Sequence, residues 1–168
     1  MGFNVVTDVA GLNNACYQIT HGLYILTASL DKPNGQCIDS LMQVTNAPPR
    51  IAIGIGTRSL TYEMISKTGV FGVNALDRHD PAWMDKVKRF GFQSGRKADK
   101  FAGIPYELGQ LGVPILPEAK AFFECRIVPE FSVDMKTHML YVAVVERAGT
   151  RDDGEPLTYN EYRRVKFG

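Results

Sequence analysis

Long apolar runs are missing from this chain of 168 residues. None approaches the roughly 20 residues that a membrane-spanning helix needs, so we expect no membrane segment. The first residues include Asp8 and lack a basic start followed by a long apolar stretch, so we expect no signal peptide. A charge excess is also missing: 19 Lys and Arg against 18 Asp and Glu leave a net charge of +1. This balance predicts neither a nucleic-acid nor a membrane partner.

Paired thiols and paired metal ligands are absent as well. The three cysteines lie far apart and in no C-x-x-C spacing: Cys16, Cys37 and Cys125. This spacing predicts neither a disulfide framework nor a thiolate metal site. We expect the three cysteines to be small buried apolar residues of a protein in the reducing cytoplasm. The three histidines form no H-x-x-x-H pair, so we expect no bound metal.

The glycine fingerprints of α/β nucleotide-binding folds are missing too. The one candidate, Gly54-Ile55-Gly56, lacks the third glycine and a suitably spaced acidic residue. No G-K-[ST] sequence is present, so a triphosphate with magnesium is not implied. A doubly wound parallel sheet is therefore not expected.

What remains is a pattern of short strands. The apolar fraction of 45% and the charged fraction of 22% are those of an ordinary globular protein, and we expect one domain over residues 1–168. Alternating or continuous apolar residues predict strands at 23–29, 36–45, 50–56, 70–76, 120–127 and 138–146. The first two are separated by a turn at 31–35, and the second and third by a turn at 46–49.

Two short helices interrupt these strands. One is expected at 60–68, with Ser59 as its N-cap and Gly69 at its end. The other runs from about 81 to 90, with Asp80 as N-cap and Pro81 in its first turn. Short strands joined by hairpins, with few helices, predict a mainly β fold built as an antiparallel barrel. The last residues, 162–166, are expected to form a basic tail.

The start of the helix at 60–68 is the first candidate site. Glycines end a strand there, and a helix start presents unpaired backbone N–H groups with a partial positive charge. Hydroxyl and guanidinium groups surround it: Thr57, Arg58, Ser59 and Thr61. These are the parts of a monophosphate site, although an ordinary capped helix with a surface arginine explains them too.

The second candidate is the later part of the strand expected at 36–45. An extended backbone offers alternating donors and acceptors to the edge of a flat heteroaromatic ring. The residues concerned are Asp39, Ser40, Leu41, Met42, Gln43, Val44 and Thr45. A half-buried barrel strand with one polar face is an equally good interpretation of this stretch alone.

Two further candidates are a basic loop and a histidine. The loop residues Ser94, Arg96, Lys97 and Lys100 suit a phosphate or a nicotinamide dinucleotide, although a solvated loop explains them as well. His138, at the start of a strand, suits proton delivery at neutral pH, although a structural role is the commoner one.

Together these stretches resemble a known family. They read L-Y-I-L-T-A, N-G-x-C-x-x-S-x-M-Q-V-T-x-x-P-P, S-L-T-x-x-x-I, G-x-F-x-V-N-x-L, F-x-x-x-S-G-R-K-x-D-K-F, P-I-L-P-E-A and L-T-Y-x-x-Y. The chain resembles the flavin reductase-like family of FMN-binding split barrels over about residues 22–162. It is most similar to flavoredoxin and to the flavin domain of high-molecular-weight rubredoxins.

The resemblance implies a homodimeric split barrel with FMN near the dimer interface. It implies that NADH or NADPH reduces the flavin, or that a redox protein partner exchanges electrons with it. Residues 39–45 would line the flavin ring and ribityl chain, and the helix start at 57–61 would hold the phosphate. Residues 94–100 would reach the flavin or its phosphate, and the catalytic residue His138 would lie near the ring.

The chain also departs from the family pattern. Residues 39–43 replace a Ser-Ser-Phe-Thr-Ser type stretch, and Lys136-Thr137-His138 replaces Gly-Asp-His. Release of free reduced flavin to a monooxygenase is therefore not implied. Three hypotheses follow: an NAD(P)H-linked FMN oxidoreductase, an FMN electron carrier between protein partners, and a barrel that binds haem instead.

Overall fold

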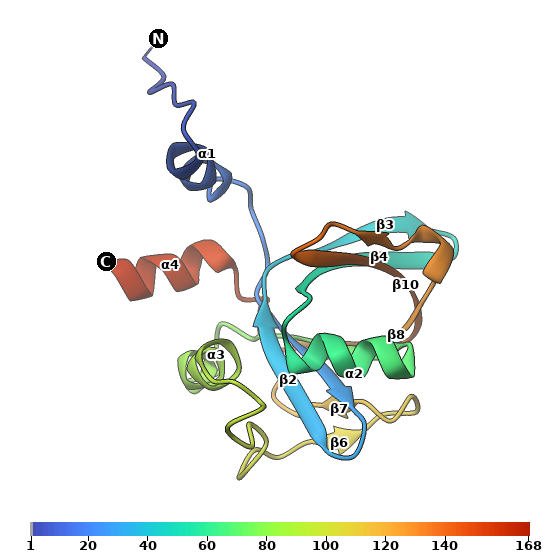
Figure 1. Ribbon diagram of the computed structural model, residues 1–168. Coiled ribbons are helices and arrows are strands. Elements are labelled where there is room, and N and C mark those ends of the chain that lie inside the picture. The colour runs from blue at the N-terminus through green and yellow to red at the C-terminus, as the bar shows by residue number, and fades with distance from the viewer. Residues whose placement is uncertain (1) are drawn as a thin grey trace.

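The structure is a computed structural model that describes residues 2–168. Within that range, eight strands form one antiparallel sheet that curls into a barrel (Figure 1). They are β1 (Tyr24–Ser29), β2 (Pro33–Ile38), β3 (Leu41–Asn46), β4 (Pro49–Gly56), β5 (Val70–Ala75), β8 (Ala121–Ile127), β9 (Val133–Asp134) and β10 (His138–Thr150). The order is β2-β1-β5-β8-β10-β4-β3, and β9 pairs with the start of β10. A separate small sheet joins β6 (Glu107–Leu108) to β7 (Pro114–Ile115).

The barrel is split between two strands that follow each other in the chain. β2 and β3 are the two ends of the strand order, yet only Asp39 and Ser40 separate them in the sequence. The sheet therefore begins and ends at the same corner of the barrel, and the chain crosses the gap in two residues. This arrangement confirms the expected mainly β split barrel.

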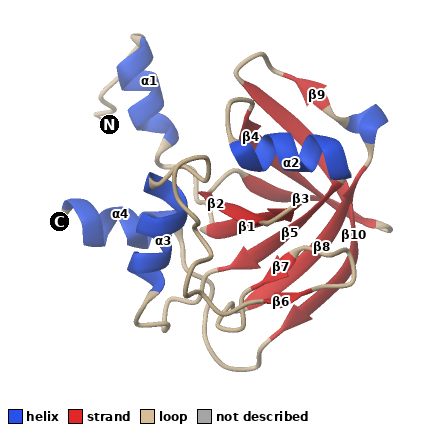
Figure 2. Ribbon diagram, turned by 60° about the horizontal axis from the view of Figure 1, so that its bottom comes forward, coloured by secondary structure: helices blue, strands red, loops and turns tan. Residues whose placement is uncertain are grey.

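Four α-helices lie around the barrel among the described residues (Figure 2). They are α1 (Val9–Cys16), α2 (Leu60–Thr68), α3 (Trp83–Phe92) and α4 (Tyr159–Phe167), with a short 3-10 turn at Pro129–Phe131. α2 packs on β1 and β2, and α3 packs on β2. The expected limits of α2 are confirmed: the Ser59 hydroxyl accepts from the N–H of Tyr62, and Gly69 ends the helix with φ of 71°.

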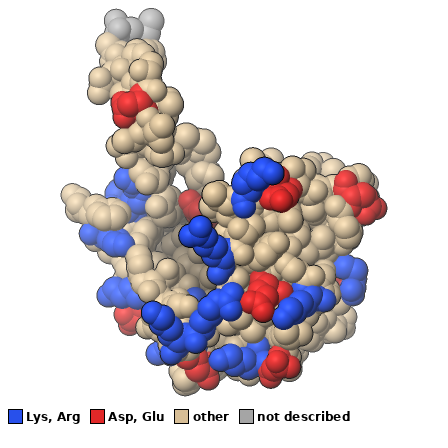
Figure 3. All heavy atoms as spheres, in the orientation of Figure 1, with Lys and Arg blue, Asp and Glu red and all other residues tan. Residues whose placement is uncertain are grey.

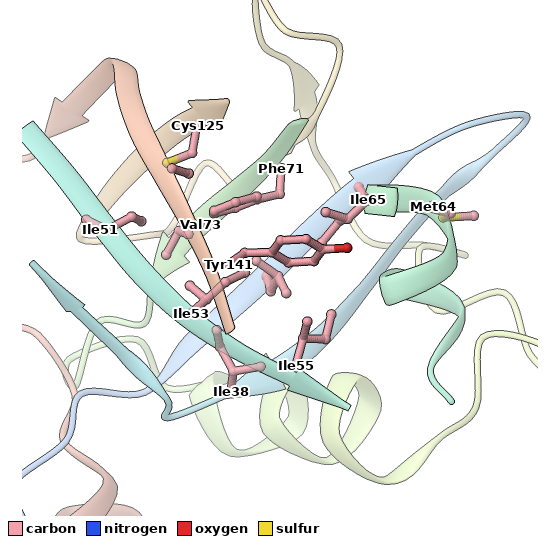
Figure 4. Close-up of a cluster of buried hydrophobic side chains, with 13 residues drawn as sticks. Ile38, Ile51, Ile53, Ile55, Met64, Ile65, Phe71, Val73, Cys125 and Tyr141 are labelled. Atoms are coloured by element: carbon pink, nitrogen blue, oxygen red, sulfur yellow. The ribbon is translucent and has the colours of Figure 1, made fainter. Parts of the chain in front are cut away.

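The main core fills the inside of the barrel. Figure 4 shows Ile53 and Ile55 of β4, Tyr141 of β10 and Phe71 of β5 pointing toward one another. Each such buried side chain contributes about 1.5–3 kcal/mol relative to exposure. Because β4 alternates, the isoleucines of β4 point into this core while Gly54 and Gly56 face outward.

A second core lies outside the barrel and fixes α3 and α4. Phe90 and Phe101 meet edge to face at 5.2 Å, and Leu157 and Tyr162 pack in the same cluster. This cluster holds the two helices beside the end of β2, next to the gap in the barrel.

Two expectations about strands and turns were wrong. Residues 36–45 are not one strand, because the chain leaves the first hairpin at Ile38 and starts a new edge strand at Leu41. Pro33 to Gly35 do not form the turn, because they pair with residues 27–29 of β1. The hairpin turn is correspondingly shorter.

Three expectations about helices also need correction. α3 begins at Trp83 rather than at Pro81, because the Asp80 carboxylate accepts from the N–H of Ala82 and pairs with Lys86 at 2.6 Å. The expected basic tail is helix α4, which a reciprocal capping box between Thr158 and Glu161 begins. Helix α1 was not expected. No helix of residues 2–168 is both long and apolar enough to cross a membrane.

Candidate functional site

A cleft of about 530 Å³ opens on the outer face of the barrel, at the gap between β2 and β3. This volume lies in the usual range for small-molecule and cofactor sites. The residues that line it come from β2, the link after it, the end of β4 and the β9–β10 hairpin: Gln36, Cys37, Ile38, Asp39, Ser40, Gly54, Gly56, Met135, Thr137 and His138. Three of the expected site residues, Asp39, Ser40 and His138, therefore share one cleft.

Two glycines of β4 keep one wall of the cleft flat. A Cβ on Gly54 would lie 3.4 Å from the Ser40 hydroxyl, and a Cβ on Gly56 would lie 3.8 Å from Nε2 of His138. Glycine inside a strand often marks a place where a ligand or another segment of backbone approaches closely. The two glycines therefore leave this part of the wall without side chains.

The link between β2 and β3 is held firmly against this wall. The Ser40 hydroxyl donates to the carbonyl of Gly54 at 2.7 Å, and the N–H of Gly54 donates to the carbonyl of Ser40 at 3.0 Å. These paired bonds leave the half-buried Asp39 at the cleft edge. The link is thus fixed in position beside the glycine wall.

The rest of the expected segment 41–45 lies away from the cleft. Leu41 packs on the main core, and Met42, Gln43 and Val44 are exposed on the edge strand. The Thr45 hydroxyl donates to the carbonyl of Pro48 at 2.6 Å, within the β3–β4 turn. The structure brings only the first two residues of this segment to the cleft.

His138 lies across the cleft from Ser40, on the outer face beside Gly56. Its Nδ1 is 3.0 Å from the Thr137 hydroxyl, which leaves Nε2 toward the cleft. The hairpin that carries it is tied to the end of β4, because the N–H of Thr57 donates to the carbonyl of Thr137 at 3.1 Å. The Thr57 hydroxyl donates to the same carbonyl at 3.2 Å, so Thr57 fixes the hairpin.

The start of α2 follows directly after the glycine wall. Among residues 2–168, the backbone N–H groups of Leu60 and Thr61 have no acceptor, while the Ser59 hydroxyl caps the N–H of Tyr62. The buried Thr61 hydroxyl accepts from the amide of Asn34 at 3.0 Å, and Arg58 is exposed. Free N–H groups at a helix N-terminus suit an anion.

The basic loop reaches the same helix start. Gly95 packs on the Asn34 side chain, which itself bonds Thr61, and the exposed Arg96 pairs with Glu63 at 2.9 Å. Lys67 also pairs with Glu63, and hydrogen bonds from these two cations lower the pKa of Glu63. Ser94 and Lys97 are exposed on the same loop. The structure therefore brings the two expected phosphate-binding segments together.

Lys100 lies elsewhere. Its buried ammonium donates to the carbonyl oxygens of Gly35 at 2.9 Å and Phe90 at 3.0 Å, which ties α3 to β2. Burial lowers the pKa of this group below its ordinary value. The ammonium is therefore engaged inside the molecule by two backbone carbonyl groups.

Several cleft residues were missed in the sequence. Gln36, Cys37, Met135 and Thr137 carry no signal of their own, but the glycines at alternate positions of β4 mark a flat strand face. Burial first, and then the neighbouring Asp39, raise the pKa of Cys37 to about 12, against a lowering by Lys100. Cys37 therefore lines the cleft as a neutral thiol.

The cleft and the helix start together suit a planar ring that carries a phosphate. The ring would lie on the glycine wall, and the phosphate would meet the N–H groups of α2. On the face drawn in Figure 3, the surface is hollowed between the N-terminal arm and the barrel, and Lys and Arg side chains gather at the rim. The described residues hold no group of three or more His, Cys, Asp or Glu side chains that suits a metal. The fold is the split barrel expected from the sequence, and the cleft is its candidate cofactor site.

The comparisons identify the family. The model of the flavin reductase like domain matches residues 16–168, so the chain belongs to the flavin reductase-like family. A high molecular weight rubredoxin of Moorella thermoacetica is 39% identical over 156 residues, which cover 92% of this chain and 66% of that protein. A ferric-chelate reductase (NAD(P)H) of Archaeoglobus fulgidus is 35% identical over 156 residues, which cover 92% of this chain and 90% of that protein.

Solved structures share the fold. The NADH:FAD oxidoreductase of Streptomyces globisporus superposes with a TM-score of 0.84 at 20% identity, over 94% of this chain and 93% of that one. Flavoredoxin of Methanosarcina acetivorans gives a TM-score of 0.72 at 22% identity, over 90% of this chain and 75% of that one. These matches confirm the split barrel, and the family confirms a flavin reductase-like oxidoreductase.

Proposed function

We propose that the chain is an NAD(P)H-linked FMN oxidoreductase that acts as one flavin-binding unit over residues 1–168, in a cytoplasmic homodimer. The observation that carries this proposal is the flat glycine wall of β4, which continues directly into the free N–H groups of α2. A ring and its phosphate fit these two places in that order. The cytoplasmic location is supported by three free thiols.

Each part of FMN has proposed partners in the cleft. Residues 39–45 would support the ring and ribityl chain, with Asp39 and Ser40 in direct contact and the others holding the strand. The phosphate partners are Thr57, Arg58, Ser59, Thr61, Ser94, Arg96 and Lys97. Lys100 would act indirectly, by fixing β2 beside the cleft. When bound, FMN supplies the hydride and electron transfer chemistry.

His138 is the proposed catalytic residue. Its Nε2 faces the glycine wall, while the Thr137 hydroxyl holds Nδ1. In this position the imidazole would hold or release a proton beside the ring. A nicotinamide would approach from the open side of the cleft.

The names of two relatives support the nicotinamide end of the electron path. The Archaeoglobus protein is a reductase that uses NAD(P)H, and an FMN reductase (NADH) of Methylorubrum extorquens is 28% identical over 156 residues. The rubredoxin relative favours a second candidate, an FMN carrier that exchanges electrons with protein partners. Stopped-flow bleaching of the bound flavin by NADH or NADPH supports the reductase, whereas bleaching only by a reduced partner protein supports the carrier.

The first experiment is an absorbance spectrum of the purified protein, with and without added FMN. Flavin absorbance bands support the proposal. A Soret band would show bound haem instead, and a colourless protein that binds no added FMN would overturn the proposal. The phosphate site is tested by Arg58→Ala with Ser59→Gly, since glycine is tolerated at an N-cap. Each lost charge-assisted bond weakens FMN binding by about 1.5–3 kcal/mol. Lys88→Ala, an exposed cation of α3, is the control.

A further inference from the structure

A groove between helices α3 and α4 opens directly beside the cleft. It has a volume of about 160 Å³, and Cys37, Ile38 and Asp39 line both the groove and the cleft. The end of β2 is therefore a shared wall between the two spaces. Complete small-molecule sites usually have about 300–1,000 Å³, so the groove takes one ring of a larger ligand rather than a whole ligand.

The outer walls of the groove are aromatic. Phe92 of α3 is 60% exposed, and Tyr159 and Tyr162 of α4 stack with ring centres 5.6 Å apart. The apolar side chains of Leu23 and Val87 are buried beneath them. Exposed aromatic rings beside a narrow groove are surfaces on which a flat base stacks.

A row of tyrosines leads from this groove to a second hollow. The ring centre of Tyr17 lies 6.3 Å from that of Tyr159. The second hollow has a volume of about 410 Å³ and is called the basic hollow here. The residues that line it are Tyr17, Gln18, Asn160, Arg163 and Arg164. Tyr159 thus connects the aromatic groove with the basic hollow.

The basic hollow carries positive charge that the chain leaves without a partner. The guanidinium of Arg163 lies 3.7 Å from the ring centre of Tyr17, which holds it in place. Within residues 2–168, Arg163 and Arg164 form no ion pair, and no acidic residue lines the hollow. In the shared orientation of Figures 1 and 3, Lys and Arg side chains gather where α4 lies. Two such arginines suit a phosphate group, which a guanidinium binds through paired hydrogen bonds.

The aromatic groove and the basic hollow together match the adenosine half of one nicotinamide dinucleotide. Adenine is a flat base, and in NADPH the ribose beside it carries a 2′-phosphate. The base and this phosphate share one ribose, so they need two neighbouring sites of these kinds. In doubly wound folds an acidic residue meets the free 2′-hydroxyl of NAD, whereas an arginine accommodates the 2′-phosphate of NADP. The same chemistry applies to the basic hollow, which offers arginines and no acid.

We infer that the groove binds the adenine of NADPH on Phe92 and Tyr159, and that Arg163 and Arg164 bind its 2′-phosphate. The inference rests on the NAD(P)H-linked reductase of the proposed function and adds which dinucleotide is used and where its far end lies. The nicotinamide reaches the flavin ring past the shared wall at Ile38. NADH has no group for the basic hollow, so NADPH is the preferred reductant.

Binding of the adenosine end alone tests the site without flavin reduction. Isothermal titration calorimetry of the FMN-loaded protein compares adenosine 2′,5′-bisphosphate with 5′-AMP, which lacks the 2′-phosphate. We expect the bisphosphate to bind at least about tenfold more tightly, because it adds a charge-assisted contact. Equal affinities, or no binding of the bisphosphate, overturn the inference.

The base is tested in the same titrations with Phe92→Ala. Both ligands carry adenine, so both should bind at least about fivefold more weakly. Phe92 is exposed, and circular dichroism checks that the variant is folded. Unchanged affinities would show that the base does not lie in the groove.

Stopped-flow and steady-state kinetics test the choice of dinucleotide. Arg163→Gln with Arg164→Gln should lower the ratio of kcat/KM for NADPH to that for NADH at least about tenfold. Lys32→Gln with Lys88→Gln removes the same charge at exposed positions outside the groove and the hollow, and should leave this ratio unchanged. A ratio that falls equally in both pairs, or in neither, overturns the inference. Fast reduction of the parent protein without a preference for NADPH overturns this inference alone, whereas a flavin that neither dinucleotide reduces overturns the proposed reductase as well.

Discussion

The two ends of strand β10 use polar side chains in opposite ways. At its start His138 is exposed beside an open cleft, and its one side-chain partner is Thr137. Near its end Arg147 pairs at 2.6 Å with Glu124, which is fully buried. The Glu124 carboxylate also accepts from the N–H of Leu111 at 2.8 Å, so the pair closes the loop before β7.

The difference lies in whether the polar groups are satisfied within the chain. A β-bulge between Val145 and Arg147 places Arg147 opposite Glu124, and Glu146 pairs on the surface with Arg126 instead. Every oxygen of Glu124 has a donor, so this end contributes to stability. At the start of β10, Nε2 of His138 has no hydrogen-bond partner among the described residues, and it lies beside the cleft where we propose that FMN binds.

The first effect that we expect separates the two ends by stability. Glu124→Ala leaves the N–H of Leu111 and the Arg147 guanidinium without this partner, and should lower the free energy of unfolding by about 1.5–3 kcal/mol. Urea denaturation measures this value. Glu146→Ala, which breaks the exposed pair with Arg126, should cost at most about 1 kcal/mol. Equal losses would contradict the assignment of a structural role to the buried pair alone.

The second effect concerns the flat wall. Gly54→Val places its side chain against Ser40 and into the cleft, and should weaken FMN binding by about 2–3 kcal/mol, which is roughly 30- to 150-fold. Fluorescence titration with FMN measures the affinity, and circular dichroism checks the fold. Ala148→Val, at an exposed position near the other end of β10, should leave FMN affinity unchanged. If the Gly54→Val variant binds FMN with normal affinity, the proposed position of the flavin ring on this wall is wrong.

Local signals explain which parts of the fold were predictable. Ser59 and Gly69 mark α2 within ten residues of sequence, and the observed limits match. The capping box of Thr158 and Glu161 is an equally local signal for α4 that the basic composition of the tail concealed. The break at Asp39 was not predictable, because neither glycine nor proline marks it and the barrel geometry imposes it.

The candidate site was predictable where it depends on backbone and not where it depends on tertiary contacts. Glycines followed by a helix start are visible in the sequence, and the structure joins them to Ser40 and His138. The burial of Lys100 was hidden, because its acceptors Gly35 and Phe90 are distant in sequence. The charge pattern alone does not distinguish a lysine that is buried in the fold, such as Lys100, from a lysine that binds a phosphate.

The third effect concerns His138, at the cleft end of β10. His138→Ala should slow reduction of bound FMN by NADH about tenfold, which corresponds to about 1.4 kcal/mol, with a smaller loss of FMN affinity. Stopped-flow absorbance gives the rate, and titration gives the affinity. The free energy of unfolding should stay within about 0.5 kcal/mol of the parent protein, because the side chain is exposed. A parallel loss of affinity and rate would indicate that His138 only supports the structure.

The smallest effect is the dependence of stability on acid. Burial raises the pKa of Glu124, but the bonds from Arg147, Leu111 and Gln110 outweigh it and hold the pKa below its ordinary value of 4.5. Because the folded pKa is the lower one, the stabilisation is complete above the unfolded pKa and is lost as the pH falls through the folded pKa. Glu124→Gln should therefore flatten the fall of the unfolding free energy below about pH 5, measured by urea titrations at a series of pH values.

An exposed carboxylate provides the control for this measurement. The pKa of Glu63 is lowered by Lys67 and Arg96 at the surface, so salt screens the effect, and Glu63→Gln should leave the acid slope unchanged at 0.5 M salt, about the concentration at which the Debye length falls below 5 Å. The Glu124 effect should persist at that salt concentration because the Glu124 carboxylate itself is fully buried. If both slopes vanish in salt, the far end of β10 is no better shielded from solvent than its start, and the contrast between the two ends fails.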